Sequence, residues 1–132
     1  MIMSTVLLSA CDPSTAGHEN LQGLGCTTGA AHIQVLDGMM IRTCGCAEAN
    51  DTIFSSGQTL TCTVNIGTKI YFDFVATTVT HQVTITSVST TPIVNPSTTS
   101  PVQTYTITPT ATGTFQFYDI FFPTLGGSIV VN

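Results

Sequence analysis

The C-terminal stretch "TGTFQFYDIFFPTLGGSIVVN", residues 112–132, decides the fold of this chain. In this stretch Phe115 and Phe117 alternate with polar residues, which is the period of a strand that buries one face. Pro123 and a Gly pair then interrupt the pattern, and an apolar run follows them. The stretch therefore predicts a hairpin in which an apolar loop joins strand 114–119 to strand 127–131.

The chain upstream of this hairpin repeats the same strand pattern from residue 31 onward. Its segments are short and rich in β-branched residues, with Gly, Ser or Pro between them. No window shows the hydrophobic period of a helix. The Pro-rich segment 89–101 is expected to be a loop, because proline cannot pair within a central strand. We predict an all-β sandwich of about seven or eight strands. The other expected strands are 31–37, 39–43, 59–64, 69–75, 81–88 and 102–108.

The composition excludes several classes of protein. Hydrophobic residues make up 42% of the chain, which argues for a packed core rather than disorder. Charged residues make up only 7%, and Arg42 and Lys69 are the only Lys or Arg residues. Nucleic acids and anionic lipid headgroups need clustered cations, so neither is an expected partner. No nucleophile triad, zincin, phosphate-loop or dinucleotide motif occurs, and we expect no enzymatic activity.

The N-terminus predicts export and lipid anchoring. Residues 1–10 form an apolar run that ends in Leu8-Ser9-Ala10 before Cys11, which resembles the bacterial lipobox. The resemblance implies that residues 1–10 are a signal peptide, that Cys11 receives a lipid and that 11–30 form a tether to the sandwich at 31–132. It places the protein in the bacterial cell envelope, periplasmic or at the cell surface, attached to the membrane through this lipid only. The alternative is a hydrophobic first strand that buries Cys11.

The remaining cysteines are expected to form two disulfides, since an exported protein meets an oxidising environment. A bond between Cys44 and Cys46 across a single glycine would be strained. Two pairings stay open: Cys26–Cys44 with Cys46–Cys62, or Cys26–Cys46 with Cys44–Cys62. A metal site built on the "CGC" thiolates is the rival interpretation.

Two segments resemble the cupredoxin family. Residues 64–86, "VNIGTKIYFDFVATTVTHQVTIT", have a Gly turn, a strand, a loop and then His81, which matches the first copper ligand of that family. Residues 108–132 match its C-terminal segment, in which a Gly-Thr-aromatic strand leads into a ligand loop and a final apolar strand. The resemblance implies a cupredoxin-like Greek-key β-sandwich over about residues 31–132.

The resemblance also implies that the blue-copper ligands are missing. On the shortest ligand loop of the family, as in its amicyanin-like members, the Cys, His and Met positions fall on Asp119, Phe122 and Leu125. Only His81 keeps its ligand identity, so we expect no resident metal, a pocket filled by Phe122 and Leu125, and a hydrogen-bonded pair of His81 and Asp119. His18 and His32 are expected to be surface residues.

The expected role is therefore a structural or protein-binding module of the envelope, in which self-association is one form of binding. The candidate contact is the loop Ile120-Phe121-Phe122-Pro123. The resemblance implies that this loop, where Phe121 is exposed, lies at the place where copper-containing cupredoxins dock their redox partners. The alternative is a copper-binding or electron-transfer protein. It would use a non-blue site at His81 and Asp119, or handle copper through Cys44 and Cys46.

Overall fold

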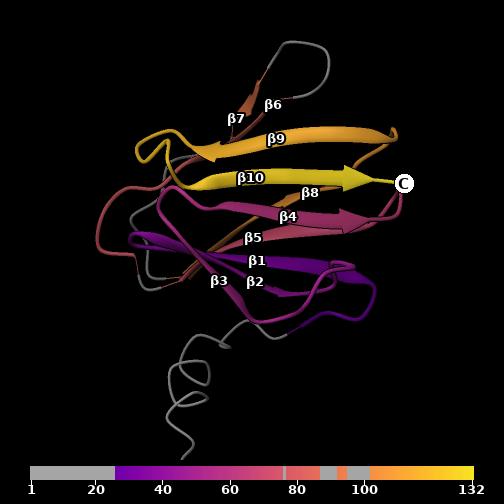
Figure 1. Cartoon of the computed structure of the whole chain (residues 1–132), viewed down its shortest axis with the longest axis horizontal. Helices are drawn as coiled ribbons and strands as arrows, with labels where there is room; N and C mark the ends of the chain where they lie inside the picture. The colour runs from indigo at the N-terminus through magenta and orange to yellow at the C-terminus, as the bar shows by residue number, and fades with distance from the viewer. Residues whose placement is uncertain (1–25, 76, 87–91, 95–101) are drawn as a thin grey trace, which may run out of the picture.

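The computed structural model describes residues 26–75, 77–86, 92–94 and 102–132 (Figure 1). The predicted signal peptide, the anchor Cys11 and most of the predicted tether, His18 included, lie outside the described residues. The described part is entirely β, and none of its segments is a helix that is long and apolar enough to cross a membrane. The strands are β1 (Ala30–Leu36), β2 (Met39–Cys44), β3 (Thr52–Ser55), β4 (Thr59–Val64), β5 (Lys69–Val75), β6 (Val83–Thr86), β7 (Pro92–Val94), β8 (Val102–Ile107), β9 (Gly113–Asp119) and β10 (Gly126–Val131).

Two five-stranded sheets form the sandwich. The first has the order β3-β2-β1-β5-β8 and the second the order β4-β10-β9-β6-β7. Both sheets are mixed, since β1 pairs with β5 in parallel and β10 pairs with β4 in parallel while the other pairs are antiparallel. The predicted all-β sandwich is confirmed.

The core lies between the sheets and comes from alternate positions of the central strands. Phe72 on β5 contacts Phe117 on β9 edge to face, with ring centroids 5.2 Å apart, so these two rings join the layers. Burial of large side chains of this kind is the main source of stability in such a domain. The best-buried apolar members are Ile33, Val35, Met40, Leu60, Ile70, Phe72, Phe74, Val83, Phe117, Leu125 and Ile129.

The C-terminal hairpin is present, and its glycines have a steric reason. β9 and β10 pair antiparallel with Phe117 opposite Gly127 and Tyr118 opposite Gly126. A side-chain carbon on Gly127 would lie 1.9 Å from the carbonyl oxygen of Leu60 on β4, and one on Gly126 would lie 2.4 Å from that of Phe117. Three strands thus approach one another at a place where only glycine fits.

Two short strands were missed by the pattern. β3 (Thr52–Ser55) adds an edge to the first sheet and lies in a stretch to which the sequence pattern assigned no strand. β7 (Pro92–Val94) lies within the segment that was expected to be a loop. It pairs only with β6, at the outer edge of the second sheet, which is where a strand tolerates proline.

The disulfides join Cys26 to Cys44 and Cys46 to Cys62, which selects one of the two pairings that the sequence left open. The first bond ties the segment before β1 to the end of β2. The second joins the segment after β2 to β4, so it links the two sheets. Gly45 between them has φ of 81°, and a side-chain carbon there would lie 1.9 Å from the carbonyl oxygen of Ala30. The "CGC" motif therefore needs its glycine to direct two cysteines to different layers.

Candidate functional site

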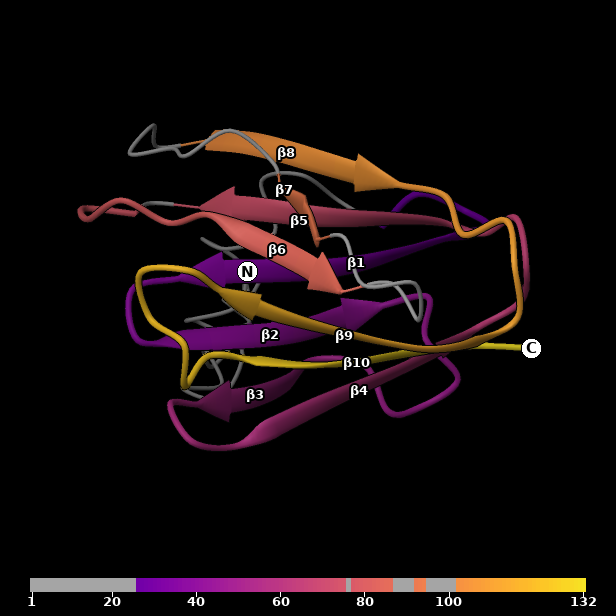
Figure 2. The same cartoon turned by 90° about the horizontal axis from the view of Figure 1, so that it is seen from above.

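Three loops meet at one end of the sandwich, opposite to the C-terminus (Figure 2). They are the turn between β1 and β2, the connection between β5 and β6, and the loop between β9 and β10. Hydrogen bonds join them: the backbone N–H of Thr78 donates to Asp37 (2.9 Å), and the N–H of Ile120 donates to the carbonyl oxygen of Gln82 (2.8 Å). Residues far apart in the sequence therefore form one surface here.

His81 lies at the centre of this end and is fully buried. Its Nδ1 is 2.5 Å from Oδ2 of Asp119, which is also fully buried, and its Nε2 is 2.9 Å from Oδ1 of Asp37. The predicted pair of His81 and Asp119 is therefore present. Asp37 was not predicted, because an Asp-Gly pair after a strand indicates only a turn, and its contact with His81 spans 44 residues of sequence.

The hydrogen bonds of His81 fix the number of protons in this cluster. A neutral imidazole has one donor and one acceptor nitrogen, whereas an ionised carboxylate only accepts. Since Asp37 is ionised at neutral pH, as its pKa below shows, Nε2–H of His81 donates to it. One further proton then lies between Nδ1 and Oδ2 of Asp119, on the imidazole or on the carboxyl group. The cluster thus holds a proton at the place where the two side chains meet.

Asp37 has a pKa lowered from 3.8 to about 2. The hydrogen bond from the Thr78 hydroxyl is the largest cause, and partial burial opposes it by raising the pKa. The hydrogen bond to His81 and the backbone N–H groups of Thr78 and Val79 lower it further. The side chain of Asp37 is 35% exposed, so it is the only one of the two carboxylates bonded to His81 that solvent reaches.

Asp119 also sets the conformation of the loop that follows it. Its Oδ1 accepts the backbone N–H groups of Phe121 (2.9 Å) and Phe122 (3.2 Å), which is an Asx turn. The backbone N–H of Asp119 donates to the carbonyl oxygen of Leu125 (2.9 Å), and that of Leu125 donates to Phe122 (2.8 Å). All four hydrogen bonds close the loop on itself, so one carboxylate connects His81 to the shape of the loop.

The loop exposes its apolar side chains. Phe121 is 51% exposed and Ile120 is 37% exposed, and Pro123 is exposed as well. Val79, from the connection between β5 and β6 at the same end, is 42% exposed. We call the side chains of Ile120, Phe121, Phe122 and Pro123 the apolar loop. Large exposed apolar side chains gathered in one place are uncommon on a monomer and typical of a contact surface.

Of the two side chains that were expected to fill the pocket, the structure buries Leu125 and leaves Phe122 partly exposed. Leu125 is 2% exposed and packs in the core. Phe122 lies against the His81 ring, with centroids 5.0 Å apart and planes tilted by 34°, but 36% of it remains exposed. Its ring therefore covers His81 from the solvent side rather than filling an interior pocket.

The other candidate residues lie elsewhere. Cys44 ends β2 and Cys46 follows it, at the opposite end of that strand from Asp37, and both are in disulfides. Across the described ranges 26–75, 77–86, 92–94 and 102–132, no group of three His, Cys, Asp or Glu side chains could hold a metal ion. At His81, the two carboxylates approach opposite ring nitrogens and do not converge on one point.

The expectation that His32 is a surface residue is wrong. His32 is 4% exposed, its Nδ1 is 2.8 Å from Oδ2 of the buried Asp73, and its ring stacks on Tyr71 with centroids 4.6 Å apart. Its Nε2 accepts the backbone N–H of Thr27 (3.2 Å), and the Thr104 hydroxyl donates to Oδ1 of Asp73 (2.9 Å). Since both nitrogens are engaged, this second His–Asp pair fastens the segment before β1 to the first sheet.

Comparisons with known proteins agree with this architecture. No protein-family model and no curated protein matches the chain. Among solved structures, a reduced mutant of amicyanin superposes with a TM-score of 0.55 at 16% identity, covering 82% of this chain and 87% of that chain. An oxidised mutant of amicyanin superposes with a TM-score of 0.56 at 15% sequence identity and covers the same shares of the two chains. The Cu(I) form of a third amicyanin mutant superposes with a TM-score of 0.55 at 17% sequence identity, covering 80% of this chain and 85% of that chain. The fold is therefore the cupredoxin-like β-sandwich.

Proposed function

We propose that this chain is an exported, lipid-anchored cupredoxin-like domain that has no blue-copper site and presents its apolar loop to a protein partner. The observation that carries the proposal is the arrangement around His81. Both ring nitrogens bind carboxylates, and one of these carboxylates, Asp119, holds the backbone of the exposed loop. The hydrogen bonds of this polar cluster connect the three loops.

The residues at this end do not fit a blue-copper centre. Such a centre needs a thiolate, two imidazoles and a weak axial thioether. The loop offers instead one carboxylate and two hydrocarbon side chains, Phe122 and Leu125. Oδ2 of Asp119 is bonded to His81 and Oδ1 to two backbone N–H groups, so a metal ion would have to break these hydrogen bonds to reach either oxygen.

A fixed apolar loop is suited to protein recognition. Binding costs conformational entropy when a loop must become ordered, and the Asx turn removes part of that cost beforehand. Exposed aromatic side chains contribute most of the affinity at many interfaces, and Phe121, at 51% exposed, is the more exposed of the two aromatic side chains in this loop. Among the residues that the structure describes, Asp37 is the one charged side chain that is bonded to this cluster and partly open to solvent, so we expect the loop to make a mainly apolar contact.

Self-association is one form of this proposal, and its contact would be between loops rather than between β4 edges. The outer edge of β4 is covered, because the backbone N–H of Ala47 donates to the carbonyl oxygen of Thr63 and Arg42 donates to that of Thr61 (2.7 Å). Glu48 accepts from the backbone N–H of Thr63 (2.9 Å). Covered edges of this kind prevent a second sheet from adding to the strand.

The test of the proposal is photo-crosslinking in the native host with a reactive residue at position 120, beside Phe121 in the apolar loop. We expect a specific adduct that Phe121→Ser abolishes. The matched control is Ile66→Ser, since Ile66 is also 51% exposed but lies in the turn between β4 and β5, where it bonds the C-terminal Asn132. An adduct that both variants retain would reject the loop as the contact.

Intact mass analysis of the same material tests the proposed lipid anchor. The proposal predicts a lipid-modified Cys11 as the first residue of the mature protein.

Copper handling is the alternative function, and the same preparation can decide it. Cys44 and Cys46 are oxidised in this structure, so they would need to be reduced before they could bind Cu(I). Metal analysis of protein taken from its native compartment is expected to find no stoichiometric copper. A copper content near one per chain that His81→Leu removes would support the alternative at His81 and Asp119.

A further inference from the structure

The outer edge of β8 is unpaired in the part of the chain that the structure describes. β8 is the last strand of the first sheet and pairs with β5 on its inner side, and no described strand lies on its other side (Figure 2). Backbone groups of a strand point alternately to its two sides, so about half of the N–H and C=O groups of its six residues point outward. A row of donors and acceptors at this spacing fits another extended backbone.

The described sheets have three other edge strands, and each of these is covered or short. Arg42 and Ala47 donate to carbonyl oxygens of β4. β3 has four residues, and the backbone N–H of Ser55 donates to the side chain of Gln58 (2.8 Å). β7 has three residues and begins with Pro92. β8, with the sequence VQTYTI, has neither a charge nor a proline, which are the usual means of blocking an edge.

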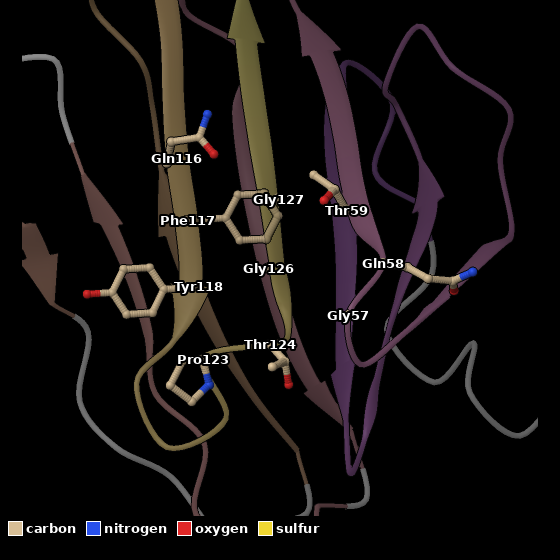
Figure 3. Close-up of a pocket in the computed structure, with 10 residues that line it drawn as sticks. All are labelled: Gly57, Gln58, Thr59, Gln116, Phe117, Tyr118, Pro123, Thr124, Gly126 and Gly127. Carbon is tan, nitrogen blue, oxygen red and sulfur yellow. The ribbon is translucent and has the colours of Figure 1, made fainter.

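The open groove on the outer face of the second sheet offers no such row of backbone groups. It lies over β10 (Figure 3), which pairs with β4 on one side and with β9 on the other. Its backbone donors and acceptors are therefore used within the sheet. The edge of β8, and not this face, is where a further strand can bind.

The two faces of β8 differ, and this difference favours a second copy of β8 as the added strand. Tyr105 and Ile107 are half-buried at the margin of the core, where the Tyr105 ring stacks on Phe72 with centroids 6.3 Å apart. Thr104 and Thr106 are exposed. Residues directly opposite in an antiparallel pair share a face. A twofold axis at Tyr105 would therefore place Tyr105 opposite Tyr105 and Thr104 opposite Thr106, and both kinds of pair stabilise a sheet.

Charge does not oppose this pairing, although the chain has a formal net charge of −5. β8 itself has no charged residue. On the neighbouring strand, Asp73 is 2% exposed and is bonded to His32 and Thr104. Lys69 begins β5 at the level where β8 ends, so a twofold axis would put the two copies of Lys69 at opposite ends of the contact.

We infer that two copies of this chain associate by antiparallel pairing of their β8 edges, which joins their first sheets into one continuous sheet. The contact is separate from the apolar loop, which belongs to the second sheet. A copy that is paired at β8 therefore keeps its apolar loop free for the protein partner proposed above. The contact through one six-residue strand is small beside a standard interface of about 1,600 Å², so the dimer is a weak one.

The test is sedimentation equilibrium of the full chain between about 10 µM and about 1 mM, with Cys11→Ser in every sample so that no free thiol can link two copies. We expect the monomer at the lower concentration and the dimer at the higher one. Thr106→Lys and Thr106→Glu should each weaken the dimer by about tenfold or more, because like charges then lie close to each other across the twofold axis. An equimolar mixture of these two variants should restore the dimer, since the charges then attract.

Two control variants separate this contact from other surfaces. Gln116 is also exposed, but it projects from β9, which pairs with β10 and β6 (Figure 3). Gln116→Lys therefore adds the same charge away from a free edge and should leave the dimer unchanged. Phe121→Ser should also leave the dimer unchanged, even where it abolishes the adduct of the apolar loop. Far-UV circular dichroism checks that each variant is folded.

The inference is overturned if the folded chain stays monomeric at every concentration, which is the result expected if the β8 edge receives a different protein. It is also overturned if Thr106→Lys dimerises as tightly as the unmodified chain, or if its mixture with Thr106→Glu fails to restore the dimer. A dimer that Phe121→Ser abolishes and the Thr106 variants retain would place self-association at the apolar loop instead.

Discussion

Removing the ring of His81 should destabilise the domain strongly, because it leaves a buried carboxylate without its partner. In His81→Leu, Oδ2 of the fully buried Asp119 loses its hydrogen bond to the imidazole, whereas the partly exposed Asp37 can turn to water. Removal of one member of a buried ionic pair costs about 3–5 kcal/mol. With a urea dependence of about 1–3 kcal/mol per molar, the midpoint should fall by about 2 M. The chain has no Trp, so unfolding is followed by far-UV circular dichroism.

Two substitutions of Asp119 sharpen this prediction. Asp119→Asn keeps an oxygen for the Phe121 and Phe122 N–H groups and supplies an NH₂ group to Nδ1 of a neutral His81, whose Nε2–H still donates to Asp37. Asp119→Asn should lower the free energy of unfolding by less than about 1.5 kcal/mol. Asp119→Ala removes the Asx turn and leaves Nδ1 unpaired, and should cost about 2–5 kcal/mol. The account of the proton between His81 and Asp119 is refuted if Asn and Ala are equally destabilising, or if His81→Leu changes the stability by less than about 1 kcal/mol.

Three further predictions concern the loop, the disulfides and Asp37. Leu125→Ala should cost about 2–5 kcal/mol of unfolding free energy, but Phe122→Ala only about 1–2 kcal/mol because its ring is half-exposed; equal urea midpoints would contradict this. Denatured but unreduced protein should contain no free thiol among Cys26, Cys44, Cys46 and Cys62, and removing either disulfide should cost about 3 kcal/mol, given sequence separations of 18 and 16 residues. Asp37 has its pKa lowered from 3.8 to about 2, so its stabilisation is complete above pH 3.8 and is lost as the pH falls to about 2. Thr78→Val should raise that pKa and move the loss to higher pH, which an NMR titration of the Asp37 carboxyl group detects; an unchanged pKa would show that the hydroxyl is not its main cause.

Local pattern was enough to predict the hairpin of β9 and β10, since the alternation at Phe115 and Phe117 and the glycines after Leu125 are all close in sequence. It also placed His81 beside Asp119, but only through the resemblance to a family loop. The sequence pattern did not predict the hydrogen-bond partners of the histidines that come from other strands and loops. Asp37 reaches His81 across 44 residues and Asp73 reaches His32 across 41, and no spacing rule connects residues that only the sheet order brings together.

The remaining errors have local causes. β3 is four residues long and carries an exposed Ile53, so its pattern resembles a turn as much as a strand. The disulfide pairing depended on the layer in which each cysteine lies, which the "CGC" motif alone does not state. Phe122 was expected inside because the family resemblance places it at a ligand position, but its backbone N–H donates to Asp119 at the end of the sandwich, and part of its ring remains in water.

The most direct test of the metal-free account is a Cu(II) titration followed by visible absorption, run on the unmodified chain and on the triple variant Asp119→Cys, Phe122→His, Leu125→Met. The account predicts that the unmodified chain stays colourless and binds no copper tightly. The variant, which retains His81 and supplies the missing thiolate, imidazole and thioether on an unchanged loop, should develop the intense blue thiolate-to-copper band. Tight copper binding by the unmodified chain that is lost in His81→Leu would contradict the central claim, and a folded triple variant that never turns blue would refute the match of Asp119, Phe122 and Leu125 to ligand positions.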